Sequence, residues 1–93
     1  FPSVRRDIAV IVSDSVPVSD LVATARAQGG PLLQDLALFD VYQGPGVEPG
    51  KKSVALGLVW QDEAETLIDA RVEEAVAKVL TALADRHDAH LRD

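Results

Sequence analysis

Three side chains that could bind a ligand by hydrogen bonding and stacking lie near one another in the sequence. Asp40 and Tyr42 are two positions apart, and Ser53 follows a stretch rich in glycine and proline, residues 44–50. A carboxylate presents only hydrogen-bond acceptors, a hydroxyl presents a donor and acceptors, and an aromatic ring presents a flat apolar surface. Over small side chains, these groups would suit an unstacked nucleobase lying against the protein.

The carboxylate of Asp40 would favour guanine among the bases, because the Watson–Crick edge of guanine presents adjacent N–H donors. Stacking of a base on Tyr42 would contribute about 1–3 kcal/mol. The alternative is that both residues belong to an ordinary exposed surface, solvated or packed against a neighbouring domain, as these residue types most often are. The pattern by itself leaves both interpretations open.

Two arginines and two histidines are further candidates for binding. Arg5 and Arg6 could contact phosphate, although charges on an edge strand also serve solubility. His87 and His90 are three residues apart, but a helix is expected to end between them and no further ligand is evident. The sequence therefore predicts no metal site and no catalytic residue.

The composition restricts the domain organisation and the kind of partner. A chain of 93 residues, 47% of them hydrophobic, suits a single domain at residues 1–93, and its start at Phe1 without any methionine indicates a fragment of a larger protein. Its net charge of −6 argues against broad binding to nucleic acid, so any such contact must be local. The absence of cysteine fits a cytoplasmic protein. No apolar stretch is long enough to cross a membrane, so no contact with a membrane is expected.

Hydrophobic periodicity and turn residues predict six elements. Strands are expected at residues 5–12, 32–43, 51–61 and briefly near 89–91, with a short helix after Pro17 and a longer one from Thr66 to about His87. Thr66 and Asp69 form a capping signal at the start of the longer helix. The order β, α, β, β, α, β predicts an α+β fold, a ferredoxin-like sandwich whose four-stranded antiparallel sheet carries both helices on one face.

The alternation of side chains along each strand predicts which residues face away from the helices. Those expected on the core side are Val54, Leu56, Leu58 and Trp60 in the third strand and Ala37, Phe39 and Val41 in the second. Those expected on the open side are Ser53, Ala55, Gly57 and Val59, then Leu38, Asp40 and Tyr42, then Asp7, Ala9 and Ile11. A small groove results, with Ala9 and Ala55 as its floor and with Tyr42 paired beside Ser53.

Several spaced sequence blocks in a fixed order resemble one known family. They are F-P-x-V-R-R-D at residues 1–7, L-F-D-V-Y-x-G at 38–44, G-K-K-S-x-A at 50–55, T-L-x-D at 66–69 and A-x-L-R at 89–92. The chain resembles the ferredoxin-fold anticodon-binding domain at the C-terminus of the bacterial phenylalanyl-tRNA synthetase beta chain. The likeness covers nearly all of its residues.

The resemblance implies a function for the parent protein and roles for four positions. The parent would be a heterotetramer of two alpha and two beta chains that charges tRNA with phenylalanine, using ATP and magnesium bound elsewhere. This domain would bind the anticodon stem-loop without any cofactor. The family's contacts imply that Asp40 and Ser53 face the guanine at the first anticodon position, with Tyr42 stacking and Ala9 lining the site.

Two other kinds of protein remain as alternatives. A ferredoxin-like module could bind another protein or a small metabolite across its sheet, in which case self-association would be expected. A small phosphatase of the same architecture would require an anion-binding loop with an arginine. The turns near Ser13 and Gly44 offer no convincing loop of that kind.

Overall fold

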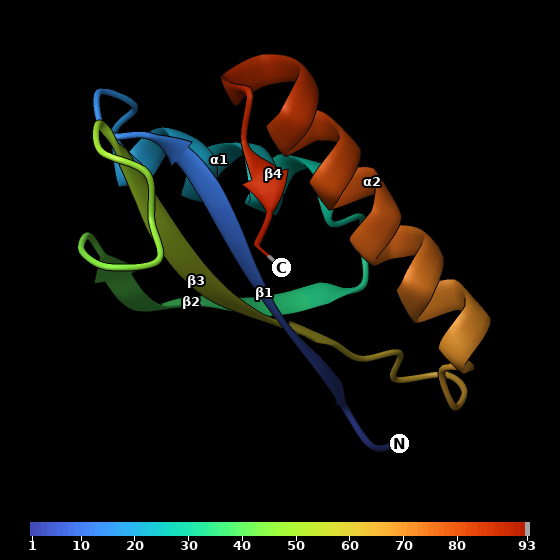
Figure 1. Ribbon diagram of the computed structural model, residues 1–93. Helices are drawn as coiled ribbons and strands as arrows, with labels where there is room; N and C mark the ends of the chain where they lie inside the picture. The colour runs from blue at the N-terminus through green and yellow to red at the C-terminus, as the bar shows by residue number, and fades with distance from the viewer. Residues whose placement is uncertain (93) are drawn as a thin grey trace.

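The computed structural model describes residues 1–92 and contains the predicted order of strands and helices (Figure 1). The elements are β1 (Val4–Ser13), α1 (Val18–Gln28), β2 (Leu33–Tyr42), β3 (Lys51–Trp60), α2 (Asp69–His87) and β4 (His90–Leu91). The strands form one antiparallel sheet in the order β2-β3-β1-β4. The predicted α+β class and ferredoxin-like architecture are confirmed. No helix among residues 1–92 has the length and apolar character needed to cross a membrane.

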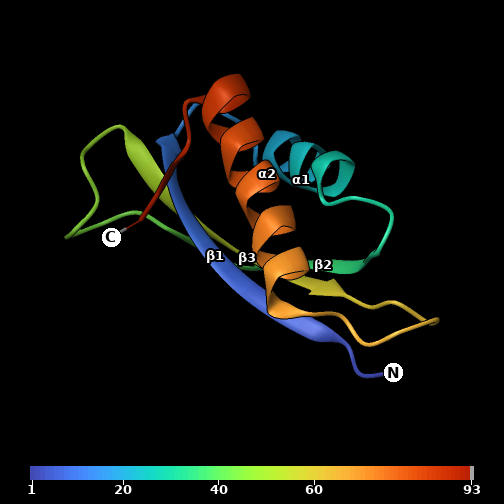
Figure 2. The same ribbon diagram turned by 90° about the vertical axis from the view of Figure 1, so that its right-hand side faces the viewer.

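Both helices lie on the same side of the curved sheet (Figure 2). We call the other side of the sheet the open face; on the central strand β3 its residues are Ser53, Ala55, Gly57 and Val59. The loop at residues 43–50 comes to this side at one end of the sheet (Figure 2). Arg92, which follows β4, also reaches this side, where it contacts Ser53. The open face is therefore bordered by the loop and by Arg92 but covered by no helix of the described residues.

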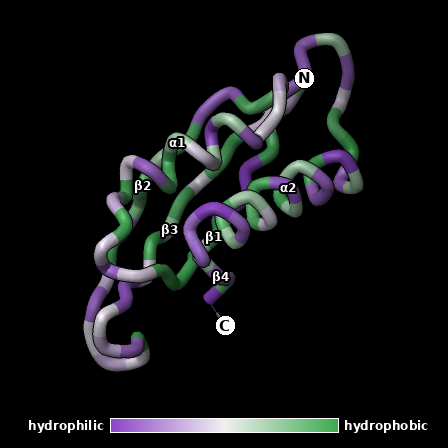
Figure 3. Tube along the Cα trace, turned by 90° about the horizontal axis from the view of Figure 1, so that it is seen from above, coloured by the Kyte–Doolittle hydropathy of each residue, from purple (hydrophilic) through white to green (hydrophobic). Residues whose placement is uncertain are grey.

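The core lies between the helices and the two central strands. Hydrophobic residues are concentrated on β1 and β3, whereas α2 alternates between hydrophobic and hydrophilic residues (Figure 3). The predicted core residues of β3 are confirmed, since Val54, Leu56 and Leu58 are almost fully buried. They pack with the buried residues Val72, Val79 and Leu83 of α2. Each fully buried side chain of this size contributes roughly 1.5–3 kcal/mol, which anchors the strands that carry the open face.

Helix α2 begins three residues later than predicted. Ile68 is its N-cap, and the Ile68 carbonyl accepts hydrogen bonds from the backbone N–H groups of Arg71 and Val72 at 3.1 and 3.3 Å. No side chain caps this end, so the proposed role of Thr66 is wrong. Ile68 is extended and its neighbour Leu67 packs against the core, so we attribute the later start of the helix to this burial, which outweighs a local capping bond.

Strand β2 contains a bulge that changes which of its residues face the helices. Leu38 pairs with the core residue Leu56. Asp40 pairs with Ala55 of the open face, which leaves Phe39 as one extra residue between the two pairs. Because one inserted residue inverts the alternation, the predictions that Leu38 faces outward and Phe39 faces the core are wrong.

The end of α2 holds a carboxylate and a histidine in contact. Asp88 has a left-handed backbone, with φ of 52°, and its Oδ1 lies 2.7 Å from His90 Nε2. This hydrogen bond, followed by the charge of His90, lowers the pKa of Asp88 below its ordinary value of 3.8. Because the pKa of Asp88 is lowered in the folded protein, its ionised carboxylate stabilises the fold above pH 3.8. This contribution to the free energy of unfolding is lost as the pH falls through the lowered pKa.

We expect His90→Ala to raise the pKa of Asp88 toward 3.8, because the two largest causes of the lowered pKa come from His90 and only the smaller effect of the Lys51 charge remains. A carbon-13 NMR titration of the side-chain carboxyl groups measures this directly. Asp85, which is exposed on the same helix, serves as an internal control. An unchanged Asp88 titration would contradict the assignment.

Candidate nucleic-acid interface

The open face is organised along β3, whose small residues lie next to polar and aromatic groups of the neighbouring strands. Ser53 pairs with Tyr42 of β2, as predicted. Ala55 pairs with Ala9 of β1 on one side and with Asp40 of β2 on the other. The register thus brings together, around Ala55, the four positions to which the resemblance assigned roles: Asp40, Tyr42, Ser53 and Ala9.

These residues form a row along β3. At one end of the row, Arg92 reaches across the open face from the edge of the sheet. Its backbone N–H donates to the Ala9 carbonyl at 2.8 Å, and its Nη1 donates to Ser53 Oγ at 3.2 Å. Its guanidinium carbon lies 5.5 Å from the centroid of the Tyr42 ring. The Tyr42 hydroxyl donates to the Pro45 carbonyl at 2.8 Å. The ring is therefore held at one face by Arg92 and at its hydroxyl by Pro45.

Asp40 presents an exposed acceptor beside this cationic group. Its side chain accepts no hydrogen bond and forms no ion pair with residues 1–92. Ser53 is 3% exposed, so its hydroxyl is held within the sheet surface. Since Ser53 Oγ accepts from Arg92, its own O–H remains able to donate. The row therefore offers an exposed acceptor and a flat ring to a planar ligand, whereas the Ser53 hydroxyl lies beneath the side chain of Arg92.

The two arginines of β1 lie on opposite sides of the sheet. Arg5 is on the open face, where its Nε donates to Asp7 Oδ1 at 2.9 Å. Arg6 is on the helix side, and its Nε donates to Glu73 Oε1 of α2 at 3.0 Å. We therefore assign Arg6 to the contact between sheet and helix and omit it from the open face. The alternation of neighbours along a strand is the reason for this separation.

Three open-face residues were missed in the sequence interpretation. Arg92 belongs to the A-x-L-R block, and the alternation from Ala89 and Leu91 already implied that it points to the opposite side. Phe39 had no local signal, because the bulge that exposes it depends on pairing with β3. Ala37, expected in the core, also faces the open side, where it pairs with Gly57.

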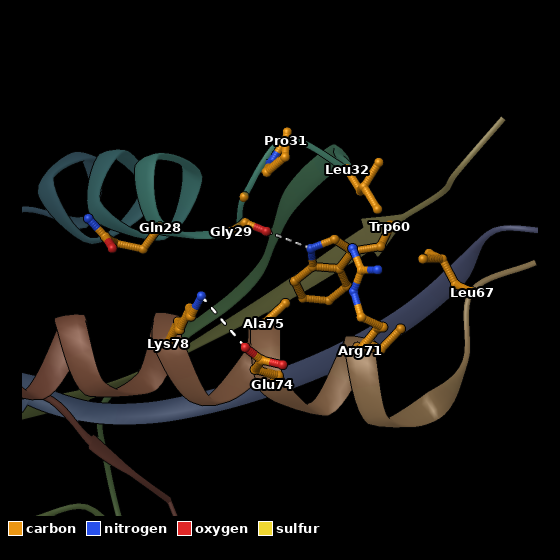
Figure 4. A pocket seen from close by; sticks show the side chains of 12 residues that line it. Gln28, Gly29, Pro31, Leu32, Trp60, Leu67, Arg71, Glu74, Ala75 and Lys78 are labelled. Atoms are coloured by element: carbon orange, nitrogen blue, oxygen red, sulfur yellow. Dashed lines mark hydrogen bonds and ion pairs between the residues drawn. The ribbon is translucent and has the colours of Figure 1, made fainter. Parts of the chain in front are cut away.

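A separate hollow of about 200 Å³ lies on the helix side, between the α1–β2 connection and α2 (Figure 4). The indole of Trp60 forms part of its wall, and Trp60 Nε1 donates to the Gly29 carbonyl at 2.8 Å. No buried side-chain polar atom within residues 1–92 lacks a hydrogen-bond partner. This hollow therefore presents no buried polar group that calls for a ligand.

The histidines lie in separate contacts. His87 Nε2 is 2.7 Å from Thr24 Oγ1 and joins the two helices, whereas His90 contacts Asp88. Within residues 1–92, no three side chains of the metal-binding types are grouped to hold an ion.

A ferredoxin-like sandwich with aromatic and arginine side chains on an open sheet surface is an arrangement that sheet domains use to stack unpaired bases. The chain belongs to the ferredoxin-fold anticodon-binding domain family, whose family model matches residues 1–92. The resemblance noted in the sequence is confirmed.

The similar curated proteins are subunits of one enzyme. The chain is 52% identical over 93 residues to the phenylalanine–tRNA ligase beta subunit of Methylococcus capsulatus. It is 50% identical over 92 residues to that of Xylella fastidiosa and 50% identical over 93 residues to that of Psychrobacter arcticus. These matches cover 99–100% of this chain but only 12% of each relative's length.

Proposed function

We propose that this chain is the anticodon-binding domain of a phenylalanine–tRNA ligase beta subunit and that its open face binds the anticodon stem-loop of the tRNA. The parent enzyme would act in the cytoplasm as a heterotetramer of two alpha and two beta chains, with ATP and magnesium bound outside this domain. The observation that carries the proposal is the grouping of Asp40, Tyr42, Ser53 and Arg92 around a floor of small residues on an uncovered sheet.

In the proposed complex, the first anticodon base is a guanine lying over Ala9 and Ala55. The Asp40 carboxylate accepts from its adjacent N–H groups, and Ser53 donates to an acceptor on the same base once the Arg92 side chain has moved aside. Tyr42 supplies the stacking surface. Asp40 and Tyr42 stand on β2 and Ser53 on β3, so paired strands rather than a flexible loop set their spacing.

The electrostatics of the open face support a local rather than an extended contact. Arg92 and Arg5 provide positive charge on a chain whose net charge is −6. With few cations to displace counterions, the isolated chain should bind RNA weakly and with a small dependence on salt. The remaining affinity for tRNA would come from other parts of the enzyme.

Replacement of Tyr42 by leucine is expected to weaken the binding of an anticodon stem-loop RNA about fivefold, because stacking on the ring is worth on the order of 1 kcal/mol. Fluorescence anisotropy titration of this chain with a labelled stem-loop measures the change. Tyr42→Phe is the matched control, since it keeps the ring and loses only the hydroxyl bond to Pro45. Equal affinity of Tyr42→Leu and the unaltered chain would overturn the proposed function.

A further inference from the structure

The open face carries a second aromatic and arginine pair that the proposed base site does not use. The guanidinium carbon of Arg5 lies 4.4 Å from the centroid of the Phe39 ring. Phe39 is 50% exposed, although an aromatic side chain of this size is ordinarily buried. The pair repeats the arrangement of Arg92 over Tyr42 at the other end of the row.

The bulge in β2 and a glycine in β3 hold the Phe39 ring flat against the sheet. The extra residue places Phe39 on the same side as Asp40, its neighbour in sequence. A Cβ atom at Gly57 would clash with the ring, with Phe39 Cζ at 2.7 Å. The ring therefore occupies space that only a glycine leaves open, which fixes its position on the strand.

The Arg5 guanidinium is held in one orientation, but only some of its N–H donors are used within residues 1–92. Its Nε donates to Asp7 Oδ1 at 2.9 Å, which holds the plane of the guanidinium over the ring. Its Nη atoms donate to no side chain or backbone group among residues 1–92, and its side chain is 54% exposed. An oriented guanidinium plane with unused donors is a surface on which an unpaired base can stack.

The pair adjoins the proposed site for the first anticodon base. Gly57, beneath Phe39, lies two residues along β3 from Ala55, the floor of that site. Two residues of a strand span roughly 6.6 Å. A nucleotide next to the first base in the loop could therefore reach Arg5 without leaving the open face.

We propose that Arg5 and Phe39 form a second nucleotide-binding position, in which the unpaired nucleotide adjoining the first anticodon base stacks on the Arg5 guanidinium. This position rests on the proposed function. Phe39 and Asp7 act as positioning residues, since they orient the guanidinium. The recognition is by stacking and tolerates any base, in contrast to the hydrogen bonding expected at Asp40.

The test is to titrate this chain with stem-loop RNAs that lack single bases. One set is intact, a second has an abasic nucleotide on either side of the first anticodon position, and a third has one elsewhere in the loop. Arg5→Lys keeps the charge and removes the plane; we expect it to weaken binding of the intact RNA about fivefold. That loss should disappear for one of the RNAs that are abasic next to the first position and persist for the third set.

Two further variants separate stacking from changes in the fold. Gly57→Ala is expected to displace the Phe39 ring and to reproduce the pattern of Arg5→Lys, with circular dichroism melting used to check that the fold is kept. Arg26→Lys on the helix side is the matched control and should change no affinity. Equal weakening of every RNA by Arg5→Lys, or no weakening, would overturn the second position. If the unaltered chain showed no preference for guanine at the first position, this result would instead overturn the proposed function.

Discussion

Replacement of Asp40 by asparagine is expected to reduce the preference for guanine over adenine at the first anticodon position by about 5- to 150-fold. The carboxylate can accept two N–H groups from guanine, whereas an amide sets its own donor against one of them. A bidentate contact of this kind is worth about 1–3 kcal/mol of discrimination between bases. The same amide is complementary to adenine, which presents an acceptor next to its amino group.

Titrations of the variant with stem-loops that differ only in the first anticodon base measure this ratio. Asp85→Asn is the control, because it makes the same change of charge at an exposed position of α2. An RNA carrying inosine, which lacks the exocyclic amino group of guanine, should lose affinity for the unaltered chain and be less affected by Asp40→Asn. An unchanged ratio in the Asp40 variant would show that the carboxylate does not read the base.

Replacement of Lys52 by methionine is expected to lower the free energy of unfolding by about 2–3 kcal/mol. Lys52 is only 7% exposed, and its Nζ donates to the carbonyls of Asp14 and Val16 at 3.0 and 2.6 Å. Methionine keeps the apolar stem of the side chain but leaves both acceptors of the β1–α1 connection without their charged donor. A buried group that loses such a partner costs about 1–3 kcal/mol.

Urea unfolding followed by circular dichroism gives this quantity as a lower midpoint with an unchanged slope. Lys51→Met is the matched control, because Lys51 is the preceding residue and has no such bonds to the connection. We expect the control to stay within about 0.5 kcal/mol of the unaltered chain. A similar loss in both variants would mean that the change of charge, not the lost bonds, is responsible.

The site depends on the same strands that form the core. Ser53 and Ala55 alternate along β3 with Val54 and Leu56, which are fully buried under the helices. Their backbone positions are therefore fixed by core packing, and substitutions on the open face can be tested with little risk to the fold. The loop that holds Tyr42 has its own constraint at Gly44, where a Cβ atom would lie 2.9 Å from the Tyr42 hydroxyl.

Predictions that depended on local periodicity alone were correct, whereas predictions at positions set by contacts between distant residues were wrong. The alternation along β3 was correct, because the side of this strand that packs under the helices is apolar from Val54 to Trp60. The same reasoning failed for Leu38 and Phe39, because a bulge is set by the pairing with the neighbouring strand. The capping signal at Thr66 failed because burial of Leu67 kept the chain extended up to Ile68.

The sequence by itself determined the order of the elements, the core sides of β1 and β3, and the placement of Asp40, Tyr42, Ser53 and Ala9 on one surface. These features follow from local periodicity, which the covalent geometry of strands and helices imposes. Only the tertiary structure decided that Arg92 reaches Ser53 across the sheet and that Phe39 lies beneath Arg5. Those contacts join residues distant in sequence, so they exist only once the strand order and register are formed.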